Sequence, residues 1–170
     1  MKYKISAKKV KLILWFALAI VLDLTLMQKI RIFGAKPMLT YSMIASVMLL
    51  EDDFSVAMIV AFTLAIVCAS LFMNSFAVEA IFIMLASVAI FSLGKKIRYI
   101  PGFIICGVIS AIVAVIHSLL CYIIADGFAA IGATGNILVA NAIYTFLAAM
   151  LIHYVMSRSV YTITIKKYTF

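Results

Sequence analysis

The sequence predicts an all-α integral membrane protein, a bundle of six transmembrane helices with both termini in the cytoplasm. Of the 170 residues, 68% are apolar and 12% are charged, whereas soluble domains are nearer half apolar and a quarter charged. Long uncharged stretches separate the clusters of Lys and Arg. Most of these stretches are close to the roughly 20 residues that a helix needs to cross the hydrocarbon core, where a helix satisfies its own backbone hydrogen bonds.

We expect a single membrane domain over residues 1–170, with spans at about 12–28, 38–50, 54–73, 76–94, 100–125 and 136–156. The first span follows five lysines and has no small-residue cleavage site after it, so we interpret it as a retained helix and not as a signal peptide. The second run, which Pro37 opens, corresponds to about 20 Å of helix and is short for a full crossing.

Polar turns set the remaining boundaries. Glu51-Asp52-Asp53 ends the second run, and Asn74-Ser75 separates the third span from the fourth. A basic segment that starts at Lys95 stops the fourth span, and Pro101 lies at the beginning of the fifth. A loop with three glycines, from Asp126 to Gly135, is expected before the sixth span.

Basic residues predict the orientation, because cytoplasmic segments of membrane proteins carry the excess of Lys and Arg. With the N-terminus inside, the inner segments carry five, three and three basic residues, eleven in all, against three in the outer segments. The distribution therefore favours both ends in the cytoplasm. If the short second run does not cross, every later assignment reverses relative to the N-terminus.

Small residues recur at every fourth position in two spans, a spacing that lets helix backbones approach closely in lipid. The third span contributes Ala57, Ala61, Ala65 and Ala69, and the fifth contributes Gly102, Cys106, Ser110, Ala114 and Ser118. We predict that both ridges are helix-packing faces, with packing of the two on each other as one arrangement. The alternative is chance recurrence in an alanine-rich membrane sequence.

Ionisable residues inside spans are the candidate functional residues, because a charge in lipid is costly. The candidates for polar or partner contacts are Asp23, Glu79, His117, Asn141 and His153. Structural roles are the favoured interpretation. Asp23 lies one turn from a span end, within reach of interfacial water or of Lys29 and Arg31, and Glu79 in a first helical turn suits the helix dipole. On the sixth span, Asn141, Thr145, Ala149 and His153 form one four-spaced stripe, which we expect to face protein.

Signatures of catalysis are missing from the sequence. It has no HExxH, P-loop or Gly-x-Ser-x-Gly motif, and no acid, base and nucleophile are evidently paired, so we expect no enzymatic activity, no catalytic residues and no cofactor. The net charge of +8 suits membrane flanks better than nucleic acid. Cys68, Cys106 and Cys121 lie in apolar runs without a CxxC, which predicts neither a disulfide nor a metal site.

The stretch from Pro37 to Leu93 has a distinctive order of elements. A proline opens a short apolar helix, an acidic turn follows at Glu51, and a span rich in small residues contains Ala61 and Ala65 before a short turn leads into the fourth span. This order, the chain length and the six spans resemble the rod-shape-determining MreD family. The chain departs from the family pattern at Ala61 and Ala65, where members often have Gly. It has Cys68-Ala69-Ser70 near the end of that span, where an acid is often found, and Lys36 before the proline, where Arg is common.

The resemblance implies a non-catalytic scaffold subunit of the bacterial cell-elongation complex, a multi-pass protein of the plasma (inner) membrane that serves rod shape and peptidoglycan synthesis. Its implied partners, besides membrane lipids, are an MreC-like protein, the cytoskeletal MreB and the enzymes that build lateral peptidoglycan. The family fold is similar to that of substrate-binding subunits of energy-coupling-factor transporters, which makes a vitamin- or small-molecule-binding subunit the alternative function. That alternative needs a partner ATPase, a ligand cavity near the outer face and an early Ala-x-x-x-Ala motif, which the first span lacks.

The C-terminal tail from Val160 to Thr169 alternates apolar and polar residues. Period-two alternation rich in β-branched residues is typical of a strand, and an edge of a partner subunit would complete it. The favoured alternative is a tail that is disordered or lies on the membrane surface, with Tyr161 and Tyr168 among the headgroups and the lysines on anionic lipid.

Overall fold

The computed structural model describes residues 7–29, 34–72, 76–97, 100–127 and 131–161. Its helices, in chain order, are α1 (Ala7–Leu24), α2 (Leu26–Lys29), α3 (Leu39–Leu50), α4 (Phe54–Phe72), α5 (Phe76–Gly94), α6 (Gly102–Asp126) and α7 (Ile131–Ser159). Among the described residues, the four helices α4 to α7 are long and apolar enough to cross a membrane. The chain is therefore a helical, multi-pass membrane protein.

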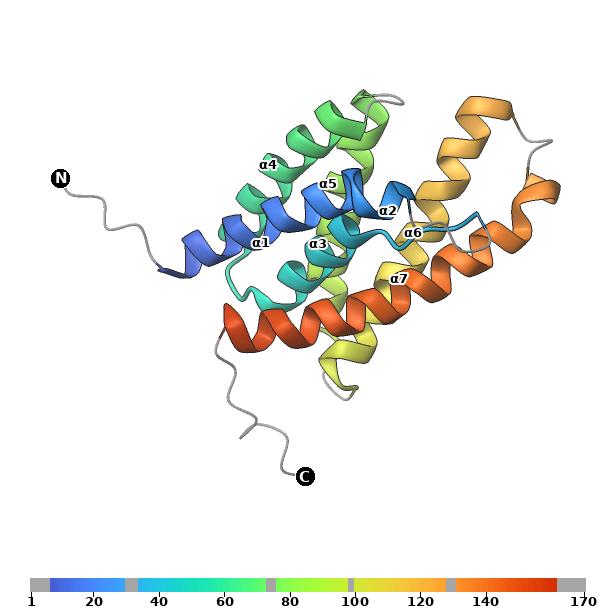
Figure 1. Cartoon of the computed structure of the whole chain (residues 1–170). Helices are drawn as coiled ribbons and strands as arrows, with labels where there is room; N and C mark the ends of the chain where they lie inside the picture. The colour runs from blue at the N-terminus through green and yellow to red at the C-terminus, as the bar shows by residue number, and fades with distance from the viewer. Residues whose placement is uncertain (1–6, 30–33, 73–75, 98–99, 128–130, 162–170) are drawn as a thin grey trace.

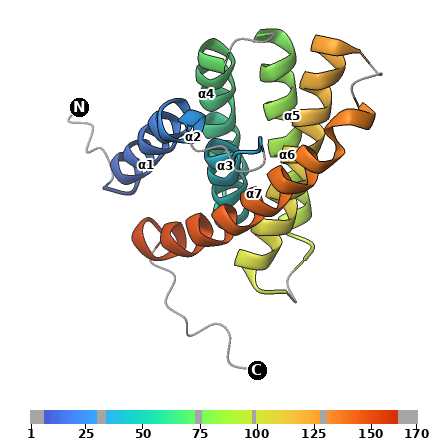
Figure 2. The same cartoon turned by 45° about the vertical axis from the view of Figure 1, so that its right-hand side comes forward.

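The short helix α3 lies at the centre of the bundle. It contacts α1, α4, α5, α6 and α7, and Figures 1 and 2 show these helices arranged around it. Nine of its twelve residues, Thr40 to Met48, are buried. Because protein and not lipid surrounds α3, this helix does not need the length of a lipid-facing span.

The outer surface of the bundle is apolar. Ile59 on α4, Leu85 on α5 and Leu151 on α7 each expose about two thirds of their surface, at 66%, 67% and 67%. Soluble monomers seldom expose such large contiguous apolar faces. Lipid is the solvent that suits these side chains.

The two ridges of small residues are buried, but they face different helices. Ala57, Ala61, Ala65 and Ala69 are at most 1% exposed on α4, whose main contacts are with α5. On α6, the ridge from Cys106 to Ser118 is buried, and the main contacts of that helix are with α7. Packing of the two ridges on each other, one arrangement considered from the sequence, is therefore not what the fold contains.

The start of α7 differs from the sequence-based expectation. A loop was expected from Asp126 to Gly135, but α7 begins at Ile131 and includes Gly135. A glycine costs a helix interior only about 1 kcal/mol, whereas extending a helix that is already nucleated adds one backbone hydrogen bond for each residue fixed. Within the expected loop, Gly127 does end a helix: it follows α6 with a φ of 72°, a left-handed conformation that favours glycine.

One end of the bundle collects the beginning of α1 and the ends of α3 and α7. Lys8 Nζ lies 2.8 Å from Glu51 Oε2, and the Tyr161 hydroxyl donates to the same oxygen at 3.3 Å. Burial and the neighbouring Glu51 carboxylate raise the pKa of Tyr161, which keeps its phenol protonated as a donor. Lys11 Nζ donates to the Ser159 carbonyl oxygen at 3.1 Å. Residues 162–170, and with them most of the alternating tail, lie outside the described residues.

Candidate functional site

The non-helical segment that leads into α3 is held by side chains of α7. The backbone N–H of Lys36 donates to Asn141 Oδ1 at 2.9 Å, and that of Met38 donates to Thr145 Oγ1 at 3.2 Å. Pro37, between them, has no N–H to satisfy. Asn141 and Thr145, two residues of the stripe predicted on this helix, thus accept hydrogen bonds from backbone N–H groups that lie outside any helix.

Asp23 of α1 caps α3 from outside that helix. Its carboxylate accepts the backbone N–H of Leu39 at 3.1 Å and of Thr40 at 2.7 Å, and the Thr40 hydroxyl at 2.5 Å. The residue at the start of α3, Met38, makes no side-chain cap of its own. Asp23 is 5% exposed and binds Leu39 and Thr40 in place of the expected interfacial water or Lys29. Arg31, the other expected partner, lies outside the described residues.

Together these contacts satisfy every backbone N–H from Lys36 to Thr40. Non-helical backbone at membrane depth is tolerated only where protein or water meets its polar groups. A carboxylate at a helix N-terminus is also favoured by the helix dipole. The arrangement therefore lets α3 begin inside the bundle, because side chains of α1 and α7 bind the backbone N–H groups at its start.

A second polar cluster joins α3, α5 and α6. Glu79, in the first turn of α5, accepts the Tyr41 hydroxyl of α3, and its other oxygen lies 2.7 Å from His117 Nε2 of α6. The rings of Tyr41 and Phe82 flank His117, with centroid distances of 4.8 and 5.4 Å. The expectation that no acid and base are paired is therefore wrong, because the fold unites residues 38 positions apart.

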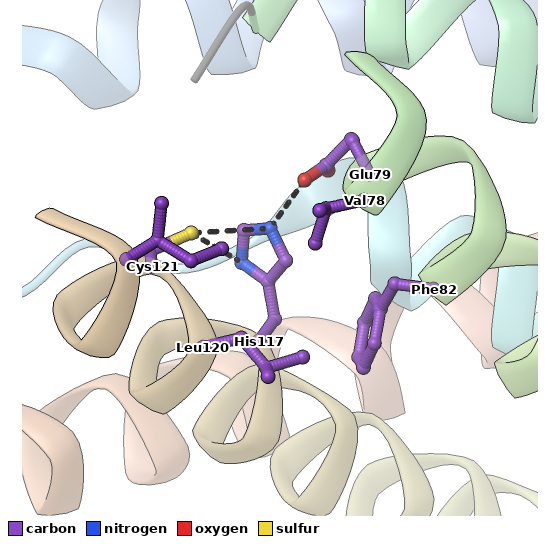
Figure 3. A pocket seen from close by; sticks show the side chains of 7 residues that line it. Val78, Glu79, Phe82, His117, Leu120 and Cys121 are labelled. Atoms are coloured by element: carbon purple, nitrogen blue, oxygen red, sulfur yellow. Dashed lines mark hydrogen bonds and ion pairs between the residues drawn. The ribbon is translucent and has the colours of Figure 1, made fainter. Parts of the chain in front are cut away.

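Figure 3 shows the His117 ring between Glu79 and Cys121. The Cys121 sulfur lies 3.6 Å from Nε2 and 3.9 Å from Nδ1. In a hydrolytic triad the nucleophile and the carboxylate contact opposite nitrogens of the imidazole. Here Glu79 binds the nitrogen to which the sulfur is also nearest, so the cluster does not have triad geometry.

His153 and Ser46 form a third polar contact, between α7 and α3. The Ser46 hydroxyl lies 3.3 Å from His153 Nδ1, and His153 is 7% exposed. The four residues of the α7 stripe, Asn141 to His153, are all buried, on a helix that contacts α3 closely. Among the described residues, no group of three His, Cys, Asp or Glu side chains is arranged to hold a metal ion.

Two cavities adjoin the His117 cluster. The smaller, of about 20 Å³, is the size of one water molecule. The larger, of about 230 Å³, lies between the loop before α3 and the helices α6 and α7. It is lined by Gly34, Lys36, Met38, His117, Ser118, Cys121, Tyr122 and Asn141.

Sequence reasoning missed Tyr41, Lys36 and Tyr122. The sequence places Pro37 at the first position of the helix that corresponds to α3, whereas α3 begins at Leu39. Tyr41 lies in the first turn of α3, but nothing in the sequence shows that it faces Glu79. Cys121 was assigned only an apolar role, although its position four residues after His117 puts both on one helix face.

The chain matches no protein-family model, no curated protein and no solved structure. Its function must therefore be argued from the residues and their geometry.

Proposed function

We propose that this chain is a six-span, non-catalytic scaffold subunit of the bacterial cell-elongation complex, with both termini in the cytoplasm. The observation that carries the proposal is how the intramembrane polar side chains are used. Asp23, Asn141 and Thr145 bind the backbone at the entry to α3, while Glu79 and His117 bind each other. With the bond from Tyr41 of α3 to Glu79, these contacts interlock α1, α3, α5, α6 and α7 into one body, as a scaffold requires.

The contacts at the end shared by α1, α3 and α7 support the proposed topology. α3 runs from the level of Asp23 to that of Lys8, because its first turn binds Asp23 and the residue after its last turn, Glu51, binds Lys8. The chain thus reverses direction at α3, as a crossing helix would. At the same end, Lys95 Nζ contacts the Asp52 carbonyl oxygen at 3.4 Å, which adds the end of α5 to the proposed cytoplasmic side.

The topology is tested by cysteine accessibility. The three native cysteines are replaced, and single cysteines are introduced at position 3 or 168, near the two termini. A membrane-impermeant maleimide should label them only after the cells are permeabilised. Labelling of either position on intact cells would contradict the cytoplasmic location of that terminus.

The scaffold function is tested by affinity purification of the tagged, full-length chain from its bacterial host in a mild detergent, followed by mass spectrometry. We expect an MreC-like protein or other cell-elongation subunits to co-purify. A variant that lacks residues 162–170 keeps Val160, which is buried, and Tyr161, which binds Glu51. Loss of the partner from this variant assigns the contact to the tail, and recovery of an ATPase module alone contradicts the scaffold proposal.

The proposed lack of catalysis has its own test, since Glu79, His117 and Cys121 do lie together. We expect that any change in cell shape caused by His117→Ala or Glu79→Gln is explained by a change in the amount of assembled complex. If either variant abolished a measured turnover while folding and assembly stayed intact, the cluster would be an active site.

A small-molecule-binding subunit of an energy-coupling-factor-type transporter is the second candidate. It is favoured by one observation, the pocket of about 230 Å³ beside Lys36 and Asn141. This pocket adjoins the first residues of α3, at the end of that helix opposite to Glu51, so the proposed topology directs it toward the outside. Co-purification of an ATPase module in the experiment above would favour this candidate.

A further inference from the structure

We propose that the pocket between the loop before α3 and the helices α6 and α7 binds a phosphate group, carried either by a small phosphate ester or by a lipid headgroup. The site stands independently of the scaffold function, because it is argued from the lining residues alone. Its volume is about 230 Å³, slightly below the range of about 300–1,000 Å³ for pockets that take drug-sized ligands. A phosphate with a few carbon atoms, such as a phosphoglycerol group, suits this space.

The charge of the lining residues favours an anion. Lys36 and His117 are the ionisable side chains of basic character in the pocket, and no carboxylate is among its described lining residues. The nearby acids are already engaged: Asp23 accepts three hydrogen bonds from Leu39 and Thr40, and Glu79 binds Tyr41 and His117. Lys36 is near enough to Asp23 for their charges to attract each other, but among described residues no carboxylate forms an ion pair with Lys36.

The neutral lining groups are arranged as donors. Asn141 accepts the Lys36 N–H through Oδ1 and donates through Nδ2 to Ser118 Oγ at 3.3 Å. Because Ser118 Oγ accepts that bond, its own hydroxyl proton is available to an acceptor. Tyr122 also lines the pocket and carries a hydroxyl, so three of the lining residues, Lys36, Ser118 and Tyr122, have side chains that can donate to phosphate oxygens.

The segment of the pocket lining that carries Lys36 is held in place by hydrogen bonds within the protein, without a ligand. Asn141 and Thr145 hold the backbone on both sides of Pro37, and Asp23 holds the first turn of α3. A site that is already ordered loses less conformational freedom on binding. This fixed loop also distinguishes Lys36 from an exposed lysine whose only role is to attract anionic lipid.

The test uses the full-length protein in mild detergent, with two probes. Isothermal titration with glycerol 3-phosphate, against glycerol at matched ionic strength, measures a free ester. Native mass spectrometry after reconstitution measures retention of phosphatidylglycerol against phosphatidylcholine. Binding in either experiment supports the site, and the experiment that succeeds identifies the source of the phosphate.

Variants assign the binding to the pocket. Lys36→Gln should weaken it about tenfold or more, because a hydrogen bond to a charged group is lost, and Tyr122→Phe should weaken it several-fold. Lys29→Gln is the matched control: Lys29 is an exposed lysine on α2 that does not line the pocket, and its loss should leave affinity unchanged.

Two results would overturn the proposal. One is binding of neither glycerol 3-phosphate nor phosphatidylglycerol by the wild type. The other is an equal loss in Lys29→Gln and Lys36→Gln, which would show general attraction to the basic surface. If Lys36→Gln does not fold, Tyr122→Phe decides, since it removes one pocket hydroxyl and no charge; unchanged affinity in that variant would contradict the site.

Discussion

The entry to α3 and the interface between α4 and α5 hold helices together in different ways. At the entry to α3, carboxylate, amide and hydroxyl groups of α1 and α7 bind open backbone. Between α4 and α5, the described residues form no side-chain hydrogen bond across the interface. Ser70 and Ser87 instead bind carbonyl oxygens of their own helices, four residues earlier.

The difference follows from what each region must satisfy. Where the backbone is already helical, its polar groups are paired, and close approach of small side chains gives the packing energy. Where the backbone leaves the helix inside the bundle, each N–H needs an acceptor, because lipid offers none. Polar residues therefore gather at the start of α3, and alanines line α4.

Removal of the Asp23 cap should have the largest effect. Asp23→Ala leaves the N–H groups of Leu39 and Thr40 and the Thr40 hydroxyl without their acceptor in a buried place, at about 1–3 kcal/mol for each group. We expect a loss of roughly 3 kcal/mol or more, measured as a lower thermal unfolding midpoint in mild detergent. Asp23→Asn keeps one acceptor oxygen and should lose less. A wild-type midpoint for Asp23→Ala would rule out the capping role.

Enlarging the alanine ridge should have the next largest effect. Ala65 is 1% exposed, so Ala65→Leu forces α4 away from its neighbour, at about 1–3 kcal/mol. Ala89→Leu makes the same change at an exposed position of α5 and should be tolerated. Equal midpoints for the two variants would mean that the ridge is not a tight contact.

A pair of glycine substitutions should give changes of opposite sign. A Cβ atom at Gly107 of α6 would lie 2.8 Å from Phe146 Cδ2 and 3.0 Å from Met150 Cγ of α7, so Gly107→Ala should cost about 1 kcal/mol. At Gly135 a Cβ atom meets no atom within 4 Å, and Gly135→Ala should raise stability by about 0.5–1 kcal/mol. Thermal midpoints of both variants test this, and destabilisation by Gly135→Ala would contradict the helical start of α7.

The ion pair between Lys8 and Glu51, at the end shared by α1, α3 and α7, should contribute least to stability. Glu51→Gln weakens the ion pair to Lys8. The side chain of Lys8 is 40% exposed and that of Glu51 is 9% exposed, so we expect a loss of about 1 kcal/mol, the upper end for pairs that solvent reaches. The loss should shrink as salt is added, because ions screen an exposed pair. Unfolding at low and high ionic strength measures it. A loss that exceeds that of Ala65→Leu would reverse the order of importance proposed for the two kinds of contact.

The helices of this fold are readable from local sequence, whereas the polar clusters are not. The apolar run between Asn74-Ser75 and Lys95, in which Glu79 is the one charged residue, predicts a helix at the place where α5 lies, since length and composition suffice. The pairing of Glu79 with His117 depends on how α5 packs on α6, and no periodicity encodes it. The same holds for Asp23, whose targets lie 16 and 17 residues further along the chain.

The contacts of Asn141 and Thr145 with the loop before α3 have a consequence for biosynthesis. These acceptors lie 105 and 107 residues after the groups that they bind, so the ribosome delivers them well after α3. Until α7 is inserted, the N–H groups of Lys36 and Met38 lack these acceptors, although Asp23 is already present to bind Leu39 and Thr40. A nascent chain halted after α6 therefore lacks two of the hydrogen-bond acceptors at the start of α3. Insertion of α7 supplies them and completes the assembly of the bundle.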